Sequence, residues 1–365
     1  MRWGLAAIAL LLFAVVMLRL FSASTPPITD LTSAPLPDAI ASLERIELGG
    51  VDQWLLIRGA NRNHPVLLWL HGGPGAAQMP VARHYNGSLE SEFVVVHWDQ
   101  RGAGKSNHRG FDPSSMRFEQ FVRDAHQLTR HLKARFGRDG IVLLGHSWGT
   151  QLGTALVREH PEDYLAYVAV SQVVDGERAT EIAHRWLLER VKAAGEHADW
   201  NRLRALGEPP YVDHADYVAF ANLVDAYGGG MDRSFRELVG VALRAAEYSA
   251  LDYLRWLVGA RRGSGPMWND PDYADFDAFE SAPRLAVPTY FISGSDDYNT
   301  PVALVGEYCA ALDAPAGKRM ITLPNAAHTP FLASPERFHD VLVAIRRDLA
   351  ASDSRAMAEG APCTT

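Results

Sequence analysis

The stretch Ile141-Val142-Leu143-Leu144-Gly145-His146-Ser147-Trp148-Gly149 determines the fold that this chain is expected to adopt. Its first four aliphatic residues predict a strand buried on both faces, and Thr150 to His160, which follow, have a helical pattern. Glycines two residues before and after Ser147 permit a sharp turn between them. Such a turn exposes the serine hydroxyl beside a helix N-terminus, which favours negative charge. We therefore predict that Ser147 is a nucleophile; the alternative is a helix N-cap serine.

Similar apolar runs recur along the chain with helical patterns between several of them. Phe118 to Leu132 carries apolar residues at spacings of three and four, and this stripe ends at Gly137. Two segments that flank Gly49-Gly50 predict a hairpin. Strands that alternate with helices predict a parallel sheet covered by helices, an α/β fold. The further predicted strands are Pro65 to Leu70, Phe93 to Trp98, Tyr167 to Val170, Thr289 to Ile292 and Met320 to Leu323.

The strand pattern is interrupted once, in the second half of the chain. Residues 177–283 are helical in pattern and rich in Trp, Tyr and Arg, so we predict a helical cap inserted over the sheet. Residues 39–176 and 284–351 then form the sheet domain. Residues 352–365 are small and polar and predict a frayed, disordered tail.

The N-terminal segment, residues 1–21, predicts export or anchoring. Trp3 to Leu18 contains no charged residue, and this length fits both a cleaved signal peptide and an uncleaved membrane anchor, with a buried first helix as a third alternative. Membrane association would then run through residues 3–21, with the rest of the chain on the periplasmic or extracellular side. Residues 22–38 contain four prolines among Ser and Thr and predict an extended linker.

The composition excludes several classes of function. The 365 residues are 47% hydrophobic and 21% charged, which fits a folded globular chain, and the formal net charge of -8 argues against nucleic acid as a partner. The chain has only two cysteines, Cys309 and Cys363, and we expect neither a disulfide framework nor a cysteine metal site from them. Asp99 to Ser106 lacks the glycine spacing of a phosphate-binding loop and predicts a structural turn in which Arg101 pairs internally. We expect no cofactor.

A serine nucleophile requires a base and an acid, which on such a sheet follow it in the order acid, then histidine. His328 lies in a loop directly after a predicted strand and is the expected base, whereas His339 lies in an amphipathic helix and is expected to be a surface or packing residue. Asp297 follows another predicted strand and is the expected acid, with Asp296 as the alternative.

An oxyanion loop is expected after the strand Pro65 to Leu70. His71-Gly72-Gly73-Pro74-Gly75 occupies this position, and its glycines would let the backbone approach a substrate closely. We predict Gly73 and Trp148 as the two backbone N–H donors; the alternative is a plain Gly-Pro turn.

Three motifs together resemble the proline iminopeptidase branch of the α/β-hydrolase fold, and the likeness spans residues 40 to 350. They are His71-Gly72-Gly73-Pro74-Gly75, Trp98-Asp99-Gln100-Arg101-Gly102 and Gly145-His146-Ser147-Trp148-Gly149. The resemblance implies an eight-stranded, mostly parallel sheet with a helical cap and a Ser147, Asp297, His328 triad.

The resemblance also implies a substrate, a small peptide or ester. Family members that are aminopeptidases bind the free N-terminal amine of a peptide with cap carboxylates, and here Glu247 is the nearest candidate, followed by Glu181 and Asp225. We expect a serine hydrolase that releases N-terminal residues, proline preferred, with ester hydrolysis as the alternative. A non-catalytic, membrane-tethered binding protein on the same fold is the alternative of another class.

Overall fold

A single eight-stranded sheet forms the centre of the computed structural model, which describes residues 22–352 together with Phe13, Met17 and Cys363. The strand order is β1-β2-β4-β3-β5-β6-β7-β8; β2 pairs antiparallel with β1 and β4, and all other neighbours pair in parallel. The predicted α/β fold with a mostly parallel eight-stranded sheet is confirmed. The strands are β1 (Ile40–Leu48), β2 (Val51–Gly59), β3 (Val66–Leu70), β4 (Val94–Asp99), β5 (Ile141–His146), β6 (Tyr164–Val170), β7 (Thr289–Gly294) and β8 (Lys318–Leu323).

The predicted hairpin joins β1 to β2. Gly49 and Gly50 have φ angles of 54° and 74°, a conformation that side chains with a Cβ rarely adopt. A two-residue turn with positive φ at both positions matches the twist of the strands it connects. The dipeptide therefore fixes the antiparallel register of this edge of the sheet.

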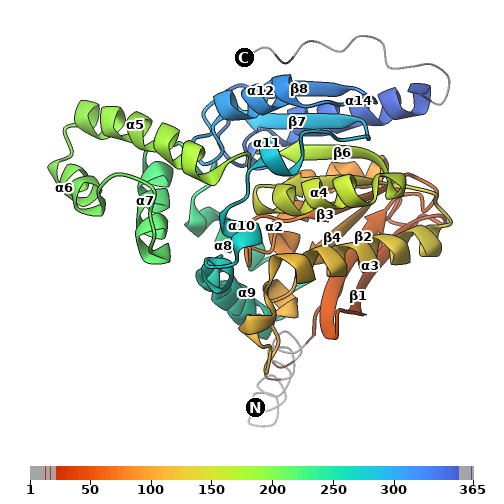
Figure 1. Cartoon of the computed structure of the whole chain (residues 1–365). Coiled ribbons are helices and arrows are strands. Elements are labelled where there is room, and N and C mark those ends of the chain that lie inside the picture. The colour runs from red at the N-terminus through yellow and green to blue at the C-terminus, as the bar shows by residue number, and fades with distance from the viewer. Residues whose placement is uncertain (1–12, 14–16, 18–21, 353–362, 364–365) are drawn as a thin grey trace, which may run out of the picture.

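Helices cover both faces of the sheet (Figure 1). On one face lie α3 (Phe118–Phe136), α4 (Trp148–Glu159) and α12 (Val302–Ala311), and on the other lie α2 (Met79–Asn86) and α14 (Pro335–Ser352). This two-sided covering explains why the parallel strands read as continuous apolar runs rather than alternating ones.

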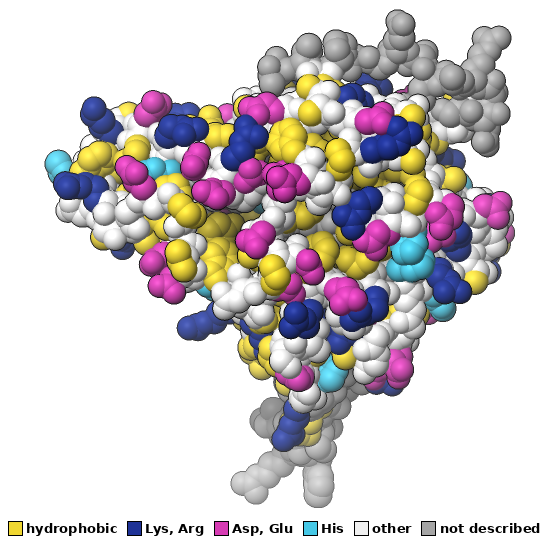
Figure 2. All heavy atoms as spheres, viewed as in Figure 1, with side chains coloured by type: hydrophobic (Ala, Val, Ile, Leu, Met, Phe, Trp, Pro, Cys, Tyr) yellow, Lys and Arg dark blue, Asp and Glu magenta, His cyan; other side chains and the backbone are white. Residues whose placement is uncertain are grey.

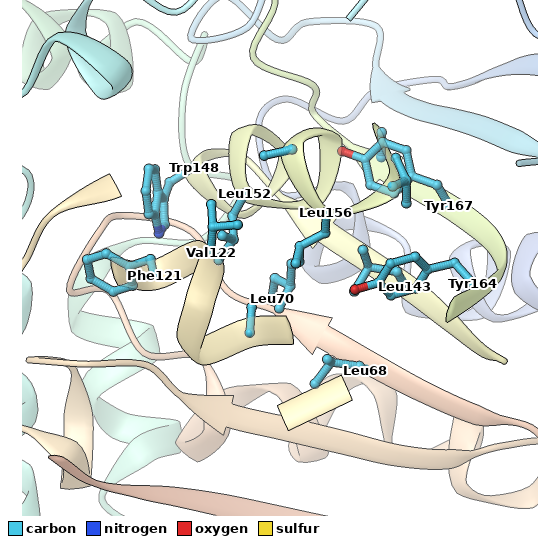
Figure 3. Close-up of a cluster of buried hydrophobic side chains, with 14 of the residues drawn as sticks. Leu68, Leu70, Phe121, Val122, Leu143, Trp148, Leu152, Leu156, Tyr164 and Tyr167 are labelled. Atoms are coloured by element: carbon cyan, nitrogen blue, oxygen red, sulfur yellow. The ribbon is translucent and has the colours of Figure 1, made fainter. Parts of the chain in front are cut away.

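Successive residues of one strand enter different cores. Leu68 packs into the core under α3 and α4, and its neighbour Trp69 packs into the core on the opposite face. Figure 3 shows the first core, where Leu152 and Leu156 of α4 lie among side chains of α3, β3 and β5. Its side chains are almost completely removed from water, so this core contributes strongly to hydrophobic stabilisation.

The cap consists of two groups of helices between β6 and β7. Helices α5 to α7 project to one side and have a hydrophobic core of their own, whereas α8 and α9 lie together at another end of the molecule (Figure 1). The cap helices are α5 (Gly176–Ala194), α6 (His197–Leu206), α7 (His214–Ala226), α8 (Phe235–Ala242), α9 (Ala250–Arg262), α10 (Pro271–Ala274) and α11 (Ala278–Ser281). The remaining α-helix of the described residues is the short α13 (Pro330–Ala333).

The two ends of the chain differ from expectation where the structure describes them. Residues 22–38 contain no helix, but they bind the folded domain: Arg58 donates to the hydroxyl of Thr25 and to the carbonyl of Pro26. The expectation that the cysteines form no disulfide is wrong, because Cys309 on α12 is bonded to Cys363. The pair could not be read from the sequence, since the two cysteines are separated by 54 positions along the chain. The predicted signal peptide or anchor, residues 1–21, lies outside the described residues apart from Phe13 and Met17, and none of the helices described is long and apolar enough to cross a membrane.

A buried ion pair ties the turn after β4 to α3. The guanidinium of Arg101 donates to both carboxylate oxygens of Asp124 at 2.9 and 3.0 Å, and it also binds the carbonyls of Leu48 and Gly49. The predicted internal pairing of Arg101 is therefore confirmed.

We expect Arg101→Met to lower the free energy of unfolding by about 3–5 kcal/mol, because it leaves the buried Asp124 carboxylate without its positively charged partner. Urea denaturation measures this loss. Arg178→Met is the matched control, since its pair with Glu307 is exposed and is expected to contribute less than about 1 kcal/mol. Equal losses for the two variants would contradict the structural role of the buried pair.

Candidate active site

Ser147 occupies a strained turn between β5 and α4. Its φ of 52° and ψ of −122° are unusual for a residue with a side chain, and such strain clusters at functional sites. The two flanking glycines are required by space: a Cβ at Gly145 would overlap the carbonyl of Gly149, and one at Gly149 would overlap the carbonyl of Leu70. The turn therefore has the geometry predicted for an exposed nucleophile.

The structure brings the three predicted side chains into one hydrogen-bonded chain. His328 Nε2 lies 2.8 Å from Ser147 Oγ, and His328 Nδ1 lies 3.0 and 3.2 Å from the two carboxylate oxygens of Asp297. The neighbouring Asp296 lies at the surface, where its carboxylate accepts a hydrogen bond from Ser295, so it is Asp297 that reaches the histidine.

The parallel sheet explains how residues so distant in sequence meet. Ser147 follows β5, Asp297 lies in the loop after β7, and His328 lies in the loop after β8. Because these strands run in the same direction, their carboxyl ends lie at one edge of the sheet, where such folds place their ligands.

Hydrogen bonds to the backbone and to a hydroxyl hold the Asp297 carboxylate. It accepts from the N–H groups of Asn299 and Thr300 at 3.0 and 2.9 Å and from the Thr300 hydroxyl at 2.7 Å. Burial by itself would raise the pKa of Asp297, but attraction to His328 and these hydrogen bonds hold the pKa below its ordinary value. Asp297 is therefore ionised and can hold the imidazole ring of His328 in its orientation.

The environment of His328 favours its protonated form. Burial alone would lower its pKa, but the charge and hydrogen bond of Asp297 outweigh burial, with further contributions from Asp232 and Asp225, so the pKa is raised above the ordinary value. A raised pKa makes the imidazole a better proton acceptor from the serine.

The other histidine beside the nucleophile does not take part in this chain. His146 Nδ1 accepts a hydrogen bond from the side-chain amide of Gln78 at 2.8 Å, and His146 Nε2 donates to the carbonyl of His328 at 2.8 Å. Burial lowers the pKa of His146 to about 3, so it stays neutral and supports the loop that carries His328. His339 lies partly buried on α14, beside Asp340.

The predicted oxyanion donors lie at the same cavity as the nucleophile. Gly73 and Trp148 line it together with Ser147 and His328. The Trp148 indole is buried and donates to Gln100 at 2.9 Å. The backbone N–H of Trp148 lies in the first turn of α4, where N–H groups have no acceptor within the helix. Gly73 has a φ of 119°, and a Cβ there would lie 2.7 Å from the nitrogen of Ala76. Only glycine therefore fits at this point of the loop.

A cavity of about 440 Å³ opens between the sheet edge and the cap. Its cap wall is aromatic, and Figure 2 shows hydrophobic side chains gathered in the hollow beside the projecting α5 to α7. Two carboxylates, Glu177 at the start of α5 and Asp275 after α10, also line it. The aromatic wall comprises Tyr211, Tyr217, Phe220, Trp268 and Tyr273.

The prediction of Glu247 as a substrate-binding residue needs correction. Its side chain is fully buried away from the cavity, where it pairs with Arg83 at 2.8 Å and accepts from the hydroxyl of Thr25. The sequence pattern predicts a charged residue of the cap. Because α2 packs against the cap, Glu247 instead forms an internal ion pair with Arg83. Glu181 points to solvent beside Arg185, and Asp225 accepts from the N–H of Met231, so neither lines the cavity.

Sequence reasoning missed a cap segment that holds the histidine loop. Asp232 accepts from the N–H groups of Ala327 and Thr329 at 2.6 and 2.7 Å, the residues on either side of His328. The carbonyl of Gly230 accepts from the N–H of His328 itself at 2.8 Å. The glycine run before Asp232 was visible only as a break between helices, although three successive glycines also signal a close backbone approach.

No cluster of His, Cys, Asp and Glu that could hold a metal ion occurs among the described residues. The arrangement of side chains instead suits attack on a carbonyl by a serine. A family model described as alpha/beta hydrolase fold matches residues 65–335. The chain belongs to this family.

This α/β hydrolase is similar along most of its length to proteins with peptidase names. It is 33% identical to the probable aminopeptidase YbaC of Bacillus subtilis, over 84% of this chain and 97% of that protein. It is 25% identical to the proline iminopeptidase of Saccharolobus solfataricus, over 78% and 85% of the two chains. The crystal structure of proline iminopeptidase from Mycobacterium smegmatis superposes with a TM-score of 0.59 at 20% identity, covering 86% of this chain and all of the other. The resemblance to the proline iminopeptidase branch is confirmed.

We expect Asp232→Asn to move the acidic limb of the pH–rate profile to lower pH. The neutral imidazole is the base, so activity is lost as pH falls through the pKa of His328, and removing the Asp232 charge lowers that pKa. We also expect kcat to fall about tenfold, because one of the two loop N–H acceptors is lost and the imidazole is displaced.

Asp296→Asn is the control for this variant, because it removes an exposed carboxylate from the neighbouring loop. The measurement is kcat/KM against pH for both variants. An unchanged profile for Asp232→Asn would show that Asp232 does not act on His328.

Proposed function

We propose that this protein is a serine hydrolase that releases N-terminal residues from peptides, with proline preferred. The observation that carries the proposal is the chain of hydrogen bonds from Ser147 through His328 to Asp297 at the wall of the cavity between the sheet edge and the cap. The relatives named aminopeptidase and proline iminopeptidase support the choice of a peptide substrate.

In the first half of the reaction, Ser147 Oγ attacks the carbonyl carbon of the residue to be released. His328 Nε2 accepts the hydroxyl proton, and Asp297 stabilises the imidazolium and fixes its orientation. The carbonyl oxygen becomes negatively charged, and the N–H groups of Gly73 and Trp148 would stabilise it; one such donor contributes roughly 10²- to 10³-fold to kcat.

In the second half, the proton on His328 passes to the departing amine, which leaves an acyl-enzyme on Ser147. A water molecule then attacks the acyl carbon, with His328 as its general base, and the serine is regenerated. No cofactor enters either half.

The cavity supports recognition of a free amine. Glu177 and Asp275 are the carboxylates that line it, and they would attract a protonated N-terminus. The aromatic wall offers apolar surface against which a proline ring can pack.

Ester hydrolysis on the same triad is the second candidate, and the apolar character of the cap wall favours it. Acyl esters need no carboxylate partner, so the two functions differ in their dependence on Glu177 and Asp275.

We also propose that the folded part lies outside the cytoplasm, on the periplasmic or extracellular side, with residues 3–21 as its export signal or anchor. The uncharged run from Trp3 to Leu18 supports this location. The disulfide between Cys309 and Cys363 supports it independently, because disulfides persist in oxidising compartments.

We expect a fluorophosphonate probe to label the protein and not Ser147→Ala, and we expect this variant to lose roughly 10⁴-fold or more of hydrolytic activity. His339→Ala, which alters a partly buried histidine of α14 that does not line the cavity, should keep both properties. Equal labelling of Ser147→Ala would show that another residue is the nucleophile. No labelling and no hydrolysis by the unaltered protein would favour the non-catalytic, membrane-tethered binding protein.

We expect the double variant Glu177→Gln, Asp275→Asn to raise KM about tenfold for proline arylamide, because the amine loses its charged partners, and to leave KM for short acyl esters unchanged. Glu181→Gln is the matched control, since it lies on the same helix but does not line the cavity. Steady-state kinetics with proline, other aminoacyl arylamides and esters measure this. Activity on esters alone would replace the aminopeptidase proposal with the esterase.

A further inference from the structure

Helix α9 presents a row of aliphatic side chains to solvent, although it also buries Trp256 and the polar Asp252. Leu251, Leu254, Leu257 and Val258 are 40%, 60%, 37% and 52% exposed, whereas Asp252 is buried. Their spacing of three, four and seven residues places them on one side of the helix. Another side of α9 packs on the core through the buried Trp256, so the row of leucines and Val258 stays uncovered in the described part of the chain.

Helix α8 adds to this surface. Phe235 and Leu243 are 62% and 61% exposed, and Phe235 stacks at 6.3 Å on Trp256 of α9, which joins the two helices. We call the exposed apolar residues of these helices the α8–α9 face: Phe235, Leu243, Leu251, Leu254, Leu257 and Val258. Single exposed apolar residues are ordinary on protein surfaces, but a group on two packed helices marks a contact surface.

The chain from the N-terminal apolar run arrives at this face. The N–H of Ser24 donates to the carbonyl of Ala246 at 3.0 Å, in the turn between α8 and α9. Thr25 is fixed next to it, between the carboxylate of Glu247 and the guanidinium of Arg58. Both partners are buried, so this attachment is part of the fold.

The short connection limits where the apolar run can go. Only residues 19–23 separate Leu18, the end of the run, from the fixed Ser24. The six steps from Leu18 to Ser24 span at most about 22 Å when the chain is fully extended. A bilayer that holds Trp3 to Leu18 therefore lies within about 22 Å of Ser24, which is bound to the turn that joins α8 to α9.

Positive charge surrounds the face. Arg236, Arg244 and Arg261 are exposed on or beside α8 and α9. Among the neighbouring carboxylates, Glu247 and Asp252 are buried in ion pairs with Arg83 and Lys105, and the exposed Glu237 is paired with Arg233. Guanidinium groups around an apolar patch match anionic lipid headgroups around acyl chains.

We propose that the α8–α9 face rests in the interfacial layer of the membrane that residues 3–18 enter, so that the cap is a second point of membrane contact. The inference rests on the proposed anchor. It assigns the face to a lipid bilayer rather than to a second copy of the chain or to residues 3–18 folded back.

The test places an environment-sensitive fluorophore on the face in the full-length protein. Leu254→Cys and Val258→Cys each supply one reactive thiol, because the native cysteines are joined in a disulfide. Leu165→Cys is the matched control: Leu165 is 44% exposed and lies near the amino end of β6, at the edge of the sheet opposite the active site. The proteins are incorporated into vesicles of phosphatidylethanolamine and phosphatidylglycerol.

At positions 254 and 258 we expect emission to shift to shorter wavelength, quenching by spin-labelled lipid, and loss of quenching by aqueous iodide. At position 165 we expect iodide quenching to persist. Vesicle-bound protein whose label at 254 stays open to iodide would overturn the inference and leave the anchor intact. Protection from iodide without quenching by lipid would overturn it in favour of protein covering the face. Protein that does not sediment with the vesicles would overturn both the anchor and the face.

Discussion

The backbone turn at Ser147 is the constraint on which the rest of the structure depends. Its positive φ is tolerated because β3 and β6 hold it from both sides: Gly149 packs directly against the carbonyl of Leu70, and the N–H of Ser147 donates to the carbonyl of Val170 at 3.0 Å. The turn therefore requires β5 between β3 and β6, which is the order observed. The same packing aims the serine hydroxyl at the sheet edge where the loops after β7 and β8 meet.

The charged part of the site depends on the cap as well as on the sheet. Asp297 orients His328 from the loop after β7, while Asp232 in the cap fixes the backbone on both sides of that histidine. The carbonyl of Gly229 also accepts from the N–H of Tyr298, so one cap segment binds both loops. Three carboxylates raise the pKa of the imidazole, and two of them belong to the cap. The cap thus shapes the base as well as the cavity.

Predictions from sequence succeeded where a local pattern has a local cause. The apolar runs became strands at nearly their predicted bounds, and Gly137 ended α3 in a left-handed conformation. They failed where the partner is distant. Glu247 carries an ordinary helical pattern, yet its partners Arg83 and Thr25 come from 164 and 222 residues away in the chain, and Cys363 reaches Cys309 from a polar tail. No spacing rule encodes such contacts, because they follow from how whole elements pack.

The sequence by itself determined the order of strands and helices, the nucleophile turn and the three residues that meet there. Each of these depends on short-range sterics: glycine where no Cβ fits, β-branched runs where both faces are buried, and a carboxylate and a histidine placed just after strand ends. Tertiary structure alone decided which carboxylates face the cavity, which are consumed in buried ion pairs, and which helix leaves its apolar side uncovered. Those outcomes depend on the packing of the cap against the sheet domain, where desolvation and close contact act between residues that the sequence keeps far apart.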